Sequence, residues 1–118
     1  MTHVDEPLLQ RMVAAIVEAA DPEQVILFGS RARGDARPDS DVDLVVVEAE
    51  PFGPGRDRRA EIVRLMRALG GCPVATDILV YSLDEVEYWR DSLNNVLARA
   101  LREGRVLYER PQAGARSS

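Results

Sequence analysis

Three aspartates stand within or at the start of apolar runs, where a carboxylate needs a partner. Asp41 and Asp43 open the run DVDLVVVE, and Asp77 interrupts the run VATDILVY. Both runs are rich in β-branched residues and predict strands over residues 41–48 and 74–81. Side chains two positions apart on a strand leave the same face, so Asp41 and Asp43 point the same way. Mg²⁺, which binds a few carboxylates plus substrate phosphates, is a natural partner for such a pair.

The third carboxylate extends this argument. A charge in the middle of a buried strand costs several kcal/mol unless it is paired or bound to metal, and Asp77 occupies such a place. If its strand lies beside the Asp41 strand, the three carboxylates converge. Three acids near a phosphate site are the inventory for phosphoryl or nucleotidyl transfer with two metal ions. The alternative is that these acids lie at a solvated strand edge, near surface arginines.

A glycine–serine pair follows the first apolar run of the chain. Residues 24–29 (QVILFG) predict a buried strand, and the small, basic segment after it predicts the start of a short helix. Gly29 lets the backbone approach a ligand closely. The Ser30 hydroxyl and the unpaired amides of a helix start form an anion site that suits nucleotide phosphates. The alternative is an ordinary glycine turn in which Ser30 caps the helix.

Missing residue types exclude several classes of chemistry. The 118 residues include no lysine, which excludes a P-loop and Schiff-base catalysis. The single histidine, His3, makes a Ser-His-Asp triad or a histidine-based zinc site a poor explanation. A formal net charge of -5 argues against direct DNA binding, although arginines cluster in the middle of the chain. Carboxylates and arginines remain for any chemistry.

The length fits one domain, which we place at residues 1–110, with a small, polar and loose tail at 111–118. One cysteine, Cys72, forbids an internal disulfide, and the acidic first residues do not match a signal peptide. No apolar run approaches the roughly 20 residues of a membrane helix. These observations predict a cytoplasmic protein without a membrane span.

Hydrophobic periodicity supplies the other elements. Helices are predicted over 7–20, 56–69, from Ser82 to about 90, and over 93–103, with a last strand at 105–108. Ser82 and Glu85 form a candidate capping box. Helices that alternate with short strands predict an α/β (α+β) fold in which helices pack on one small mixed sheet.

Two surface questions stay open at this level. Tyr88 and Trp89 are read first as core residues, and the rival interpretation is an exposed patch for a partner or a second copy. The helix at 56–69 is expected to bury Ile62, Leu65, Met66 and Leu69. Its arginines are expected to form a solvated face, and a surface for an acidic partner is the alternative.

The combined spacing is far more specific than its parts. Gly-Ser, a ten-residue spacer and Asp-x-Asp within a strand occupy residues 29–43. This is the signature of the DNA polymerase β-like nucleotidyltransferase superfamily. The run GSRARGDARPDSDVDL resembles its minimal nucleotidyltransferase branch in particular. Asp77 matches the third carboxylate of that family, and ARALREGRVLY (98–108) is similar to the end of the branch.

The resemblance implies a nucleotidyltransferase fold and Mg²⁺-dependent transfer of AMP from ATP to a hydroxyl, with two metal ions. It assigns the metal and catalytic roles to Asp41, Asp43 and Asp77, and phosphate binding to Gly29 and Ser30. Arg31 and Arg33 are expected to add positive charge there, with surface ion pairing as their alternative role.

The resemblance also implies a partner. Members of this branch are typically paired with a HEPN-domain protein as a toxin–antitoxin couple, in which the transferase adenylylates a tyrosine of the toxin. The chain is expected to assemble with that partner or with itself. The alternatives are a catalytically silent antitoxin that neutralises its partner by direct contact, and transfer to a small molecule such as an aminoglycoside.

Overall fold

The computed structural model describes residues 6–29, 41–70, 75–92 and 95–111. The predicted fold class is confirmed, and each helix and strand expected in these ranges is present with its ends displaced by up to three residues. The predictions for residues 30–40 and for the tail at 112–118 lie outside the described residues. The elements are α1 (Glu6–Ala20), β1 (Gln24–Phe28), β2 (Val42–Glu48), α3 (Arg58–Ala68), β3 (Thr76–Ser82), α4 (Leu83–Trp89), α5 (Val96–Glu103) and β4 (Arg105–Glu109).

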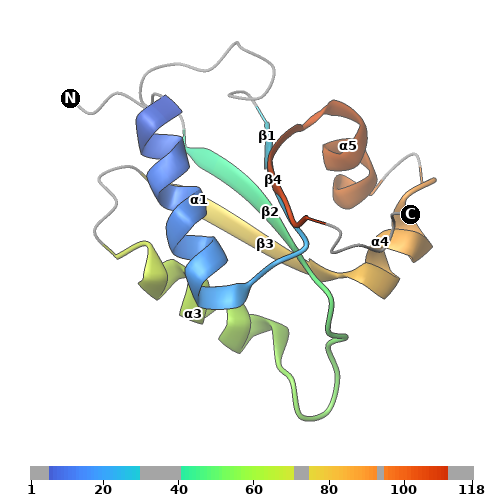
Figure 1. Ribbon diagram of the computed structural model, residues 1–118. Helices are drawn as coiled ribbons and strands as arrows, with labels where there is room; N and C mark the ends of the chain where they lie inside the picture. The colour runs from blue at the N-terminus through green and yellow to red at the C-terminus, as the bar shows by residue number, and fades with distance from the viewer. Residues whose placement is uncertain (1–5, 30–40, 71–74, 93–94, 112–118) are drawn as a thin grey trace.

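The four strands form one mixed sheet in the order β3-β2-β1-β4 (Figure 1). β1 runs antiparallel to both of its neighbours, whereas β2 and β3 are parallel. Parallel neighbours need a crossover connection, and α3 provides it. Because β1 is antiparallel to β2 and β2 is parallel to β3, β1 finishes at the same end of the sheet at which β2 and β3 begin. Residues just after β1 and residues early in β2 and β3 therefore share one end of the molecule.

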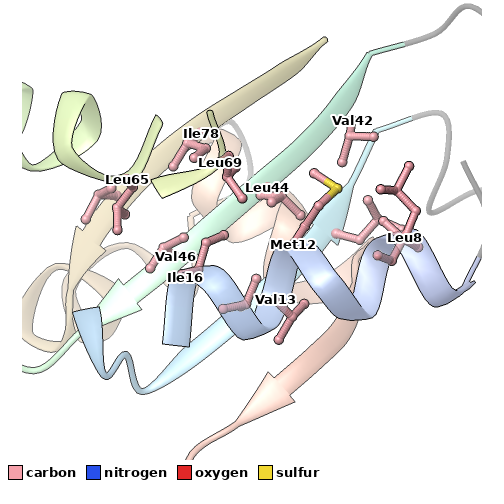
Figure 2. Packing of buried hydrophobic residues seen from close by; sticks show 14 residues of the cluster. Leu8, Met12, Val13, Ile16, Val42, Leu44, Val46, Leu65, Leu69 and Ile78 are labelled. Atoms are coloured by element: carbon pink, nitrogen blue, oxygen red, sulfur yellow. The ribbon is translucent and has the colours of Figure 1, made fainter. Parts of the chain in front are cut away.

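Helices cover both faces of the sheet. α1 and α3 pack on one face, where Ile16 and Leu65 meet Leu44 and Val46 (Figure 2). On the other face, Leu97 of α5 belongs to a second apolar cluster. β2 is buried on both sides, which explains the unbroken apolar sequence of its second half. A carboxylate early in such a strand is therefore an exception that needs a reason.

Side-chain caps set the starts of three helices. The Asp57 carboxylate accepts a hydrogen bond from the Ala60 amide at 2.9 Å at the start of α3. The predicted capping box of α4 is present, with the Ser82 amide donating to Glu85 at 3.0 Å. The Asn95 side chain accepts from the Leu97 amide at 2.8 Å and begins α5. Such caps satisfy amides that the helix cannot pair internally.

Two expectations about burial are wrong. Met66 was expected on the buried face of α3, but it is 41% exposed because Ile62, Leu65 and Leu69 take that face. Tyr88 was expected in the core, but it is 77% exposed at the end of the short helix α4, and Trp89 is exposed as well. Val86 is the residue of α4 that reaches the core. Within the described segments, no helix has the length and apolarity that a membrane crossing requires.

Candidate active site

Register pairing places two of the predicted carboxylates side by side. Asp43 of β2 pairs with Asp77 of β3, and on its other side it pairs with Phe28 of β1. Residues in register on adjacent strands share a face, and neighbouring strands lie about 4.8 Å apart. The row Phe28–Asp43–Asp77 therefore crosses three strands on the face that α4 and α5 cover further along. The expected adjacency of the two aspartate-bearing strands is confirmed.

Asp41 lies just before β2, at the same end of the sheet. It is exposed and precedes the first residue of β2, so it lies one residue outside the strand that was predicted to include it. The Val42 amide donates to the carbonyl of Ala75 at 2.9 Å, which fixes the start of β2 against the chain that leads into β3. All three acids thus lie at one end of the sheet, Asp43 and Asp77 on adjacent strands and Asp41 just before β2.

Gly29 closes this site from the end of β1. Its φ angle is +78°, a backbone conformation that residues with a side chain rarely adopt. A Cβ atom at this position would lie 2.6 Å from Oδ2 of Asp43. Glycine is therefore required twice here, once for the turn and once for the space beside the carboxylate.

The exposure of the acids corrects part of the sequence argument. Asp77 is exposed rather than buried, because β3 is an edge strand and Asp77 lies near its first residue. The desolvation cost expected for it therefore does not arise. Asp43, on the interior strand β2, is half-buried, while Val42 and Leu44 are fully buried on the opposite face. Ser30, Arg31 and Arg33 lie outside the described residues.

The donor set fits a hard divalent cation. Carboxylate oxygens on adjacent strands, open to solvent on the Asp77 side, suit Mg²⁺, which takes one or two carboxylates and completes its shell with water and phosphate oxygens. No group of three or more metal-binding side chains is close enough among the described residues to hold an ion by itself.

Phe28 is the site neighbour that the sequence argument missed. It is half-buried and pairs with Asp43 across the antiparallel strands, so its position extends the carboxylate row on the β1 side. Strand alternation along β1 determines which face of the sheet carries Phe28. The register between β1 and β2, which puts it opposite Asp43, is set by tertiary packing.

A second charged cluster lies at the other end of β2. The Glu48 side chain is only 4% exposed, forms an ion pair with Arg56, and has one oxygen, Oε2, without a hydrogen-bond partner among the described residues. Burial and the neighbouring Glu61 carboxylate raise the pKa of Glu48 to about 7. Burial opposes ionisation of Glu61 too, but the hydrogen bond from Arg64 and the interaction with Glu48 leave the pKa of Glu61 lowered. Of the two neighbouring carboxyl groups, Glu48 is therefore the one that binds a proton more readily than an ordinary glutamate.

Comparisons with known proteins agree with this architecture. A family model described as a nucleotidyltransferase domain matches residues 9–93. A structure described as a putative minimal nucleotidyltransferase is 32% identical, with a TM-score of 0.57, over 88% of this chain and 97% of that one. No match was found among curated proteins.

Two further structures share the fold at lower identity. A putative nucleotidyltransferase from Sulfolobus solfataricus is 22% identical, with a TM-score of 0.62, over 88% of this chain and 79% of that one. A toxin–antitoxin structure determined with AMP-PNP is 20% identical, with a TM-score of 0.51, over 90% of this chain and 74% of that one. The match over residues 9–93, together with the carboxylate row, shows that the chain belongs to the nucleotidyltransferase domain family.

Proposed function

We propose that this protein transfers AMP from ATP to a hydroxyl group, and that the acceptor is a tyrosine of a partner HEPN-domain toxin. The observation that carries the proposal is the register pairing of Asp43 with Asp77 beside Gly29. Membership of the nucleotidyltransferase domain family supports the reaction class. The toxin–antitoxin structure with AMP-PNP, which shares the fold, supports the adenine nucleotide and the antitoxin role.

Each site residue has a role in this proposal. Metal ions bound here supply charge neutralisation at the attacking and leaving oxygens of an in-line displacement. The carboxylates that would hold two Mg²⁺ ions are Asp41, Asp43 and Asp77, and the residues that would hold the triphosphate are Gly29, Ser30, Arg31 and Arg33. The half-buried Asp43 suits a fixed ligand because its position is set from three strands.

Asp77 is suited to receive the proton. It lies on the edge strand and is exposed, so a large acceptor such as a protein side chain has access to it. In the proposed step, the acceptor oxygen bonds to the α-phosphorus as the bond from that phosphorus to the bridging oxygen of the β-phosphate breaks. Pyrophosphate leaves with the bond electrons, and the hydroxyl proton passes to the Asp77 carboxylate.

The alternative is neutralisation of the toxin by contact alone. Under that alternative the carboxylate row has no task, and a variant that lacks Asp43 binds and silences the partner as well as wild type does. Exposed apolar side chains on the helices could also bind a partner protein. An experiment that measures transfer and binding separately therefore distinguishes the two functions.

The test uses α-labelled ATP, Mg²⁺ and lysate of the host, with wild-type protein and the Asp43→Asn variant side by side. Glu18→Gln, an exposed carboxylate on α1, is the matched control. We expect a labelled protein band with wild type and Glu18→Gln, no band with Asp43→Asn, and no band when the metal is chelated. Mass spectrometry of the band then locates AMP on a residue of the acceptor.

A parallel pull-down separates the two accounts. If wild type and Asp43→Asn capture the same partner, mass spectrometry shows whether that partner already carries AMP. If the partner carries no AMP and neither protein labels it, transfer is refuted and neutralisation by contact becomes the function. If the label appears on a small molecule instead of a protein, the reaction class stands and the HEPN acceptor is refuted.

A further inference from the structure

Helix α4 presents an acidic surface with an aromatic projection. Glu87 and Tyr88 follow Asp84 by three and four positions within α4, so these three residues share one side of the helix. Tyr88, 77% exposed, stands edge-on against Trp89 with ring centroids 4.8 Å apart, which restrains both rings. Arg90 lies 3.2 Å from Glu87 and offsets one negative charge. We call this surface the aromatic–acidic face; it consists of Asp84, Glu87, Tyr88, Trp89 and Asp91.

Helix α3 presents the opposite chemistry. Val63 and Met66 are 43% and 41% exposed on its outer side. Arg59 and Arg67 flank them, and neither forms an ion pair with another described residue. This differs from Arg64, which is engaged by Glu61 at 2.7 Å. We call this surface the basic–apolar face; it consists of Arg59, Ala60, Val63, Met66 and Arg67.

α3 and α4 meet at their first turns through the Arg58–Glu85 ion pair, and this contact uses no residue of either face. α3 packs through Leu65 and Leu69 on one face of the sheet, and α4 packs through Val86 on the other (Figure 1). The aromatic–acidic face combines exposed apolar side chains with negative charges. The basic–apolar face combines exposed apolar side chains with positive charges. A second copy of the chain offers each face a surface of opposite charge that also carries exposed apolar side chains.

We propose that the aromatic–acidic face of one copy docks on the basic–apolar face of a second copy. The contact is heterologous, because each copy uses a different face, so a bound pair still offers one unused face at each end. Each face covers one short helix and buries less than the roughly 1,200–2,000 Å² of a standard stable interface, so the association is weak and concentration-dependent. Opposite charges at its rim make it sensitive to salt. The proposal does not depend on nucleotidyl transfer.

Sedimentation velocity over a range of protein concentrations tests the contact. We expect the average mass of wild type to rise with concentration, and to rise less at about 0.5 M than at about 0.05 M salt because screening weakens the charge pairs. Tyr88→Asp and Met66→Asp should each remain monomeric where wild type associates. Val106→Asp is the control, because Val106 is 50% exposed on β4 and lies outside both faces.

Mixing the two variants gives the decisive result. Tyr88→Asp keeps an intact basic–apolar face and Met66→Asp keeps an intact aromatic–acidic face, so an equimolar mixture should form a dimer and nothing larger. Arg67→Glu and Asp91→Arg, which exchange charge at exposed positions, repeat the test if circular dichroism shows that the first pair folds poorly. A wild type that is monomeric at every concentration refutes the proposal. So does a mixture that stays monomeric, or a pair of variants that each associate as wild type does.

Discussion

A Cβ atom on Gly29 would lie 2.6 Å from Oδ2 of Asp43, so the Asp43 carboxylate of β2 occupies the space that a side chain at position 29 would need. The turn thereby contacts the central residue of the carboxylate row. A side chain at position 29 would therefore press directly on the Asp43 carboxylate.

Replacing Gly29 with alanine should abolish nucleotidyl transfer and destabilise the fold. The left-handed backbone costs an alanine about 1 kcal/mol, and overlap with the Asp43 carboxylate adds on the order of 1–3 kcal/mol or displaces that carboxylate. Gly55→Ala is the control, because Gly55 has a φ of +95° and nothing within 4 Å of the added Cβ. Urea denaturation of both variants should show the larger loss for Gly29→Ala, and equal losses would contradict the contact.

Asp77→Asn should remove transfer while leaving the fold intact. The side chain is exposed and at the edge of the sheet, so its change to an amide should alter the free energy of unfolding by less than about 1 kcal/mol. Transfer should fall by about a hundredfold or more, since a charged ligand and proton acceptor is lost. Transfer assays over a Mg²⁺ series, beside urea denaturation, check both statements. A variant that transfers at the wild-type rate would remove Asp77 from the site.

Glu48 should give the fold an unusual pH dependence. The folded-state pKa of Glu48 is about 7, above its ordinary value of 4.5, so the folded protein binds this proton more tightly than the unfolded chain does. The contribution of this group to stability is full below about pH 4.5, is lost as pH rises to about 7, and is constant above that.

Glu48→Gln should therefore stabilise the protein more at pH 8 than at pH 5, by on the order of 1 kcal/mol, because the amide keeps a donor toward Glu61 without a titratable proton. Urea denaturation at the two pH values measures this difference. Glu50→Gln is the control, since Glu50 is an exposed carboxylate 3.5 Å from the same Arg56. If Glu48→Gln changes the free energy of unfolding equally at both pH values, the raised pKa of Glu48 is not the cause of the pH dependence.

Arg58 should tolerate replacement by lysine poorly. Its guanidinium donates to the Val80 carbonyl at 2.6 Å and to Glu85 at 2.8 Å, and it lies 4.6 Å from the centre of the Phe52 ring. A lysine ammonium cannot reproduce this planar, forked arrangement, and we expect a loss of about 1 kcal/mol after allowing for solvent screening. Arg59→Lys, one residue along and exposed, should change the melting temperature little. Equal shifts in the two variants would assign no special role to Arg58.

The sequence by itself determined the individual helices and strands of this protein and the motif that identifies its family. β-branched runs specified β2 and β3, the 3.6-residue periodicity specified α1, and Ser82 with Glu85 specified the start of α4. The spacing over residues 29–43 was enough to assign the family. These features depend on neighbours along the chain, so the chain order alone carries them.

Only the tertiary structure decided what depends on neighbours in space. The parallel register of β2 and β3 brought Asp77 opposite Asp43, and the antiparallel register of β1 brought Phe28 to the same row. The place of β3 at the sheet edge, rather than its composition, left Asp77 exposed. The short contact of α4 with the core left Tyr88 in solvent despite its aromatic ring. Strand order, register and helix rotation follow from the best burial of all apolar faces at once, and no single segment contains that information.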